Sequence, residues 1–245
     1  MKITIDGRAF QDAAIFASTE EVQYYLQGVA VEPSADEPGY VIAVATDGHR
    51  MVAIKAIGAV DPPDARPIIN LACLAAVKKA RNPWIIVEDG TASVLDLGRN
   101  VKVTKPDEVP TATSSFAVAS FQNCLIDAAY PDWRLVMPMA VDDGAGRPIA
   151  PPAFNAAYLA DFAKVSRPSG LKRNSVAPIR VVPTRGNGPA WVFLPERPEF
   201  VGLLMPLRAN KQGRPGWLDA PKPLPVATIL ETPAYYTDLN TAAAA

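Results

Sequence analysis

Proline is the feature that most constrains how this chain can fold. Its 245 residues include 25 prolines, about twice the usual share of roughly 5%. Because proline lacks a backbone N–H and its ring clashes with the preceding helical turn, it ends or kinks helices. The sequence therefore predicts short helices and many strands. Hydrophobic residues make up 49% of the chain, enough for one large domain or two small ones, but no apolar run is long enough to span a membrane.

Three segments have the periodicity of short amphipathic helices, and polar caps or prolines mark their ends. These segments are residues 7–17, 71–82 and 153–167, with Asp6 and Asn70 as caps of the first two. The N-terminal residues 1–6 have a strand-like pattern. Further β-rich stretches between turn residues predict strands at 22–31, 40–46, 49–57, 84–87, 93–97, 101–104, 115–126, 179–182, 190–194 and 200–205.

The strongest local signal is a hairpin around Asp47-Gly48. Apolar stretches precede Asp47 and follow His49, and an Asp-Gly pair between two strands favours a type I′ turn. Gly48 tolerates the positive φ that such a turn needs. Taken alone, the motif is compatible with a simple turn followed by an exposed strand start.

A weak internal repeat suggests a modular chain. The pattern Asn-x-Ala-x-Leu-Ala-x-x-x-Lys begins at Asn70 and again at Asn155, and each copy precedes several predicted strands. In an alanine-rich chain such a match can also arise by chance. If it is genuine, the chain holds three units of one helix plus several strands, at about 1–60, 65–139 and 148–208.

The scarcity of reactive side chains excludes several kinds of chemistry. The chain has one histidine, His49, and two cysteines, Cys73 and Cys124, too few for a Cys/His zinc site. It also lacks phosphate-loop and nucleophile-elbow motifs, so we expect no metal, no cofactor and no catalytic residues. Both cysteines lie in apolar segments and the N-terminus has no signal-peptide core, which predicts reduced, buried thiols in a cytoplasmic protein.

Four motifs along the chain resemble one known family. They are Tyr-Tyr-Leu-Gln-Gly-Val from Tyr24, Ala-Thr-Asp-Gly-His-Arg-Met from Ala45, Tyr-Pro-Asp-Trp-Arg from Tyr130 and Leu-Met-Pro-Leu-Arg from Leu204. In this order they resemble the bacterial DNA polymerase III β subunit, the sliding clamp, over about residues 8–208. The resemblance implies an α+β sliding-clamp fold, in which repeated units of one short helix pack on antiparallel sheet.

The resemblance covers only part of a family chain. Residues 1–139 resemble the family's middle domain, made of two half-units, and 148–208 resemble the second half of its last domain. Residues 209–245 are a proline-rich tail, which we expect to be extended, with one strand-like stretch at 226–230. A family ring is closed by two chains of six half-units each, twelve in all, whereas this chain has three half-units. Four copies would restore the twelve, so we expect a homo-oligomer, with a tetramer as first choice.

The resemblance also implies a surface pocket that receives short hydrophobic peptides from polymerases and other partners. By position, the pocket residues would be Leu26, Thr46, Gly48, His49, Arg50, Met51, Pro131, Val136, Met205, Pro206, Leu207 and Arg208. Apolar side chains would form its floor, while His49 and Arg50 would bond peptide carbonyls or a carboxylate. The family often has a second arginine where this chain has Leu135, which would shift its preference toward apolar peptides.

Basic residues near two predicted helix ends provide candidates for contact with DNA. They are Lys78, Lys79, Arg81, Lys164, Arg167, Lys172 and Arg173. In clamps the helices line a central channel and face the DNA backbone, so such contacts would be independent of base sequence. The alternative is that these cations only complement helix C-termini and keep the surface soluble.

Together these features predict a DNA sliding clamp-like processivity factor without catalytic activity. It would encircle or contact double-stranded DNA, and its pocket would tether DNA polymerase and other clamp-binding peptides, with a clamp loader as a possible partner. The alternative is a clamp-derived peptide-binding module or decoy that does not encircle DNA. An enzyme on a β-rich scaffold would need an active site that His49 and the scattered acidic residues do not supply.

Overall fold

A computed structural model of the protein describes residues 1–110, 116–138, 152–166, 177–184 and 188–207. All of them belong to one structural unit, Met1–Arg208. The predicted tail at 209–245, with its strand-like stretch at 226–230, lies outside the described residues. No helix among the described residues is long and apolar enough to cross a membrane.

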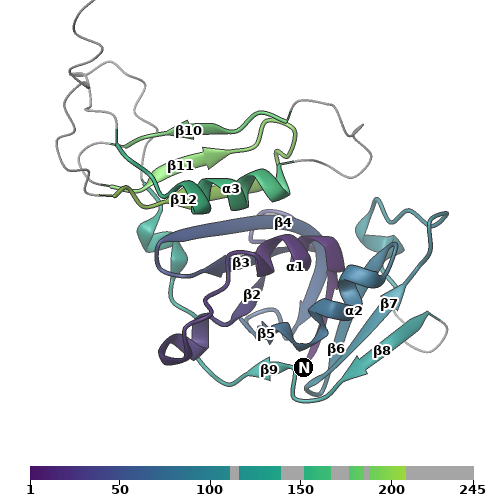
Figure 1. The fold of residues 1–245 in the computed structure, drawn as a ribbon. Coiled ribbons are helices and arrows are strands. Elements are labelled where there is room, and N and C mark those ends of the chain that lie inside the picture. Colours follow the sequence, from purple (N-terminus) through teal and green to yellow (C-terminus); the bar gives the residue numbers. More distant parts are fainter. Residues whose placement is uncertain (111–115, 139–151, 167–176, 185–187, 208–245) are drawn as a thin grey trace, which may run out of the picture. The chain divides into compact units, whose positions relative to one another are not determined.

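Antiparallel strands dominate the fold, as the sequence predicts (Figure 1). The strands are β1 (Lys2–Asp6), β2 (Gly28–Pro33), β3 (Tyr40–Thr46), β4 (Arg50–Asp61), β5 (Ile68–Asn70), β6 (Pro83–Glu88), β7 (Thr91–Asp96), β8 (Ala117–Phe121), β9 (Leu125–Ile126), β10 (Arg180–Val182), β11 (Ala190–Phe193) and β12 (Phe200–Leu204). Nine of them follow the order β8-β7-β6-β1-β4-β3-β2-β5-β9, and β12, β11 and β10 branch from β4.

The helices are short, in agreement with the proline content. The α-helices are α1 (Gly7–Ala14), α2 (Leu74–Lys79) and α3 (Ala156–Val165), and the 3₁₀ helices are η1 (Glu21–Leu26), η2 (Leu71–Cys73), η3 (Pro106–Glu108) and η4 (Trp133–Val136). Asp6, Asn70 and Asn155 each accept a hydrogen bond from the backbone N–H two residues later, at 2.8, 3.0 and 2.9 Å. The three helical segments, η2 and α2 being continuous, therefore begin with the same side-chain cap.

The sheet buries both of its faces. On β4, Val52 and Ile54 point into the large core that α1, α2 and α3 cover, including Phe10 and Phe162. Ala53, between them, points to the opposite face, as the two-residue period of a strand requires. That second face is covered by the segment after β9, which carries Tyr130 and Trp133. The helices and this segment therefore lie on opposite faces of one sheet.

Residues from α3 onward join the rest of the unit through both main chain and side chains. Strand β12 pairs with β4, with Gly202 opposite Val52. The ring of Phe162 on α3 lies 4.8 Å from that of Phe16, which follows α1. Arg197 donates to the Asp12 carboxylate on α1 at 2.7 Å and to the Val165 carbonyl at 3.0 Å. The described residues from α3 onward thus share the sheet and the core of residues 1–138.

Three strand predictions were wrong, one of them entirely and two in part. The segment predicted as a strand at 22–31 begins with η1, because the Leu26 carbonyl accepts from the Ser18 N–H at 2.9 Å and closes a turn. Residues 101–104 are not a strand: the Asn82 side chain bonds the Val101 carbonyl, and Glu108 accepts from the Thr104 N–H. The described part of 115–126 forms two strands, β8 and β9, rather than one. Strand β5 was not predicted.

Candidate functional site

The β3–β4 hairpin forms as predicted, but its turn is wider than type I′. Thr46 pairs with Met51, so four residues connect the paired positions. Gly48 has a φ of +84°, whereas Asp47 does not have the positive φ that a type I′ turn requires. The physical reason is the Asp47 carboxylate, which accepts from the backbone N–H groups of His49 at 2.9 Å and Arg50 at 3.0 Å. This side chain supplies the hydrogen bonds that stabilise the longer loop.

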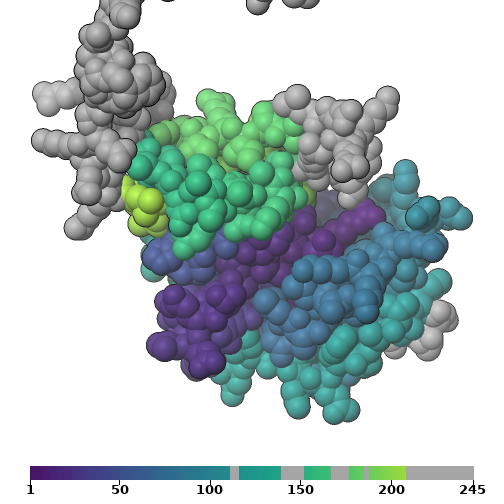
Figure 2. All heavy atoms as spheres, viewed as in Figure 1, coloured from purple at the N-terminus to yellow at the C-terminus, as the bar shows by residue number. Residues whose placement is uncertain are grey.

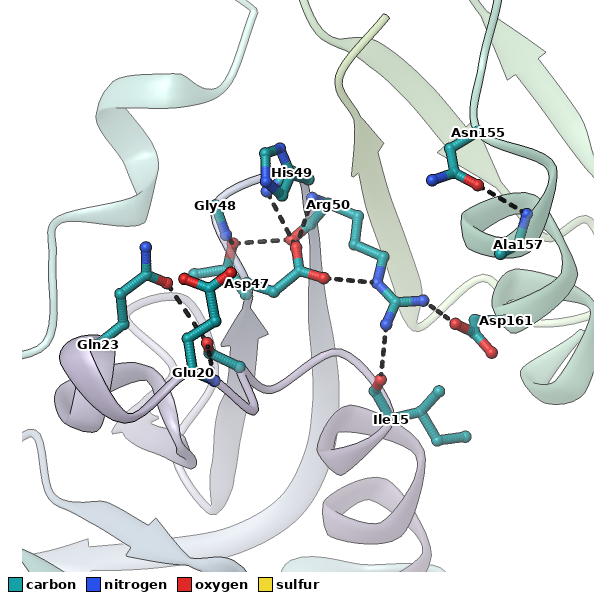
Figure 3. A network of polar contacts seen from close by, with 12 residues as sticks. Ile15, Glu20, Gln23, Asp47, Gly48, His49, Arg50, Asn155, Ala157 and Asp161 are labelled. Atoms are coloured by element: carbon teal, nitrogen blue, oxygen red, sulfur yellow. Dashed lines mark hydrogen bonds and ion pairs between the residues drawn. The ribbon is translucent and has the colours of Figure 1, made fainter. Parts of the chain in front are cut away.

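Arg50 ties the hairpin to two helical segments (Figure 3). Its guanidinium donates to the Asp47 carboxylate at 3.0 Å, to the Ile15 carbonyl at 3.2 Å and to Asp161 on α3. It also lies over the rings of Phe16, at 5.2 Å, and Tyr158, at 4.7 Å. The side chain is only 10% exposed. Arg50 therefore positions the hairpin, and its predicted role of bonding a peptide at the rim stays a prediction.

His49 is exposed, and its ring stacks on Tyr158 of α3 with centroids 5.9 Å apart. Its carbonyl accepts from the Met205 N–H at 2.9 Å. The end of the hairpin is thus joined to α3 and to the segment that follows β12. Residues far apart in the sequence are fixed next to one another by these contacts.

A second group of contacts fixes η4 against the sheet. Glu32 on β2 is buried, and its carboxylate accepts from the Trp133 indole at 3.2 Å and from Arg134. Arg66 lies 3.6 Å from the other carboxylate oxygen, and the Arg134 guanidinium lies 4.3 Å from the Trp133 ring. Glu32 therefore anchors the short helix that carries Val136.

Hairpin, η4 and the segment after β12 enclose a cavity of about 220 Å³. Nine of the twelve predicted pocket residues line it: Leu26, Thr46, Gly48, His49, Arg50, Met51, Pro131, Val136 and Met205. Pro206 and Leu207 do not line it, and Arg208 lies outside the described residues. Met51 and Leu203 belong to the sheet face opposite the α-helices, so the floor of the cavity lies on that face.

Sequence reasoning missed several lining residues. They are Tyr25, Tyr130, Asp132, Trp133, Pro189 and Leu203. Four of these stand inside quoted motifs and Leu203 stands beside one, which could have indicated them, whereas nothing marked Pro189. Burial raises the pKa of the Tyr130 phenol, and this hydroxyl is buried without a hydrogen-bond partner among the described residues. It is therefore a neutral polar group in the wall of a mainly apolar cavity.

The predicted DNA-facing cations that the structure describes are all exposed. Lys78 and Lys79 occupy the last turn of α2, Arg81 follows it, and Lys164 occupies the last turn of α3. Lys164 forms an ion pair with Asp161, the carboxylate that also binds Arg50. Three further candidates, Arg167, Lys172 and Arg173, lie outside the described residues. The role of these cations stays a prediction.

Cys73 and Cys124 are free and buried, as predicted. Burial, with a smaller effect of the neighbouring Cys124, raises the pKa of Cys73 to about 12. Such a thiol is not a nucleophile near neutral pH. Among the described residues, no group of three or more His, Cys, Asp or Glu side chains could hold a metal ion.

The structure was compared with solved structures once this geometry was established. A sliding clamp (DNA polymerase III subunit beta) from Bartonella birtlesii bound to griselimycin matches with 16% identity and a TM-score of 0.58, over 85% of this chain and 66% of that chain. The sliding clamp of Bacillus subtilis matches with 19% identity and a TM-score of 0.55, over 86% and 65% of the two chains. Caulobacter crescentus pol III beta matches with 20% identity and a TM-score of 0.56, over 85% of this chain and 66% of that chain.

The chain thus matches just under two thirds of the length of these clamps. No protein-family model and no curated protein matches the sequence. At these identities the comparison concerns the fold, and it confirms the predicted α+β class. This protein has the fold of the bacterial DNA polymerase III β sliding clamps in a shortened form.

Proposed function

We propose that this protein is a clamp-like tethering factor, which holds DNA polymerase or other partners through a short apolar peptide seated in the cavity. The convergence of the hairpin, η4 and the segment after β12 on one apolar cavity carries this proposal. Met51, Val136 and Met205 supply adaptable apolar contacts, and the backbone and His49 supply polar ones. Tethering raises the effective concentration of a partner at its substrate and requires no catalysis by this chain.

The cavity needs residues from both the first two half-units and the third unit. Residues 1–139, as two half-units, would supply the hairpin and η4, and residues 148–208, as a third, would supply Met205 and the support of α3. The cavity is incomplete without the third unit, because Pro189, Leu203 and Met205 line it. Under this proposal, the chain keeps those units of a clamp that build one complete peptide site.

We propose further that several copies form a ring around duplex DNA, with four copies as first choice. In the described sheet, β8 and β10 each pair on one side only, and exposed sheet edges are normally covered. Head-to-tail pairing of β8 with β10 of the next copy would cover both. The exposed cations Lys78, Lys79 and Lys164 would then contact phosphates from the helix face, opposite the peptide site.

The second candidate is a binding module or decoy that occupies clamp-binding peptides without encircling DNA. One chain supplies all the described lining residues of the cavity, so peptide binding needs no second copy, and this favours the module. Both candidates use the same cavity, so only the relation to DNA distinguishes them.

A threading experiment separates the two. The protein is incubated with linear duplex DNA carrying biotin at both ends, streptavidin is added before or after the protein, and retention is measured at high salt. A ring is retained only when the ends are blocked after it has threaded, because enclosure does not depend on salt-sensitive contacts. Equal loss in both orders, together with a monomeric mass by light scattering, would support the module.

A further inference from the structure

A second cleft, of about 330 Å³, lies where α1 begins. Its walls come from the start of α1, the residues after α2 and the segment that follows β7. The eight residues of α1 rise about 12 Å from this cleft toward the Arg50 hairpin. Figure 2 shows purple atoms from the N-terminal part of the chain in contact with blue and teal atoms from residues later in the sequence. The cleft is therefore separate from the peptide cavity.

Positive charge sets this cleft apart. Arg8, Arg81, Arg99 and Lys102 line it, and Asp6 is the only carboxylate among its described lining residues. Within the described residues none of the four cations forms an ion pair, although the whole chain has a net charge of −1. Cations gathered in one place repel one another and raise the local concentration of anions. The cleft is thus suited to an anionic ligand.

The segment that carries Arg99 and Lys102 is held in place by hydrogen bonds. Asp96 accepts from the backbone N–H groups of Asn82 at 3.1 Å and Gly98 at 2.9 Å. The Asn82 side chain donates to the Val101 carbonyl at 2.8 Å. Gly98 has a φ of +74°, which lets the chain turn sharply at this point. Because these bonds order the segment in advance, an anion would not have to order it on binding.

Exposure and continuity indicate which anion fits. All four cations are exposed, whereas a site for a small free anion would enclose its cations. Arg81 also follows Lys78 and Lys79 of α2 closely in the sequence, so the cleft extends a row of surface cations. Such a row matches a polyanion with regularly spaced charges.

We propose that this cleft binds backbone phosphates of duplex DNA, so that contact with DNA extends from the helix face to the start of α1 and the segment after β7. This inference rests on the proposed function, since it assumes that the protein meets duplex DNA. Arginine donates to two phosphate oxygens at once, and such contacts carry no base preference.

The test measures duplex binding by fluorescence anisotropy across a salt series. The double variant R99Q/K102Q is compared with K2Q/K55Q, which removes the same charge from partly exposed side chains outside the cleft. If both residues contact phosphates, the slope of log affinity against log salt falls by about 1.8 for R99Q/K102Q, at roughly 0.9 per contact. K2Q/K55Q should keep the wild-type slope.

Three results would overturn the inference. If R99Q/K102Q keeps the wild-type slope while charge reversal at Lys78, Lys79 and Lys164 abolishes binding, the cleft is not a phosphate site. The proposed contact between the helices and DNA then still stands. If wild-type protein does not bind duplex DNA, the inference falls together with the DNA part of the proposed function. Inorganic pyrophosphate that binds the cleft without competing with duplex would also overturn it, by assigning the cleft to a free anion.

Discussion

Replacing Asp161 with alanine should destabilise the protein and loosen the peptide site together. The Arg50 and Asp161 side chains are 10% and 16% exposed. Leaving a buried charge without any partner costs about 3–5 kcal/mol, but Arg50 keeps Asp47 and the Ile15 carbonyl as partners. The expected loss is therefore that of one charge-assisted hydrogen bond, about 2 kcal/mol. The bond from Lys164 adds little, because that side chain is 63% exposed.

Urea denaturation of the full chain measures this loss, and D64A, which removes an exposed carboxylate, is the matched control. D161N keeps an oxygen that can accept from Arg50, so its loss should be smaller. Affinity for an apolar peptide should also fall in D161A, because the hairpin loses its connection to α3. A free energy of unfolding for D161A within 0.5 kcal/mol of that for D64A, roughly the spread of neutral surface changes, would refute this view of Arg50.

The loss of stability caused by D161A should depend on pH. Burial alone raises the pKa of Asp161, but hydrogen bonds from Lys164 and Arg50 outweigh burial and hold the pKa below its usual value. A carboxylate with a lowered folded-state pKa stabilises the protein above the unfolded-state pKa, about 3.9, and this contribution is lost as pH falls through the folded-state value. The stability difference between wild type and D161A should therefore be constant from pH 5 to 8, as both values lie below about 4, and shrink below that window.

Three further changes test other parts of the account. E32Q should lower stability by about 1–3 kcal/mol in urea and weaken peptide binding, and unchanged binding would show that Glu32 does not position η4. G202A should cost about 1–3 kcal/mol, because the added Cβ would lie 2.4 Å from the Phe162 ring, and a thermal melt equal to that of wild type would contradict this packing. Cys73 should stay unreactive toward Ellman's reagent at pH 8 until the protein unfolds, because burial raises its pKa to about 12. Reaction in the native state would mean that the thiol is accessible.

Local sequence signals predicted most of the fold. Strand β3 has the predicted bounds, and the caps at Asp6 and Asn70 form as expected, because both depend on interactions within a few residues. The strand prediction was wrong over residues 22–26, because the hydrogen bond between Ser18 and Leu26 closes a turn there that β-propensity does not reveal. The predicted type I′ turn at Asp47-Gly48 was wrong, because the sequence pattern shows the glycine but not the hydrogen bonds that the Asp47 side chain accepts.

The candidate site was predictable only through the resemblance. Its three segments are far apart in the sequence, and no periodicity indicates that Met205 lies beside the hairpin. Long-range polar contacts were beyond prediction for the same reason: Glu32 reaches Trp133, 101 residues away, and Arg50 reaches Asp161, 111 residues away. Residues 101–104 were predicted as a strand, so the role of the segment after β7 as one wall of a basic cleft could not be anticipated.

Titration of the full chain with a short peptide bearing two or three large apolar side chains tests the central claim most directly. The account predicts saturable binding at micromolar strength, about −8 kcal/mol, and a loss of about 1–2 kcal/mol in M205A, because Met205 lines the cavity and is 42% exposed. V22A, which removes an exposed apolar side chain outside the cavity lining, should bind as wild type does. No saturable binding by folded wild-type protein, or equal affinity for M205A and wild type, would contradict the assignment of this cavity as a peptide site.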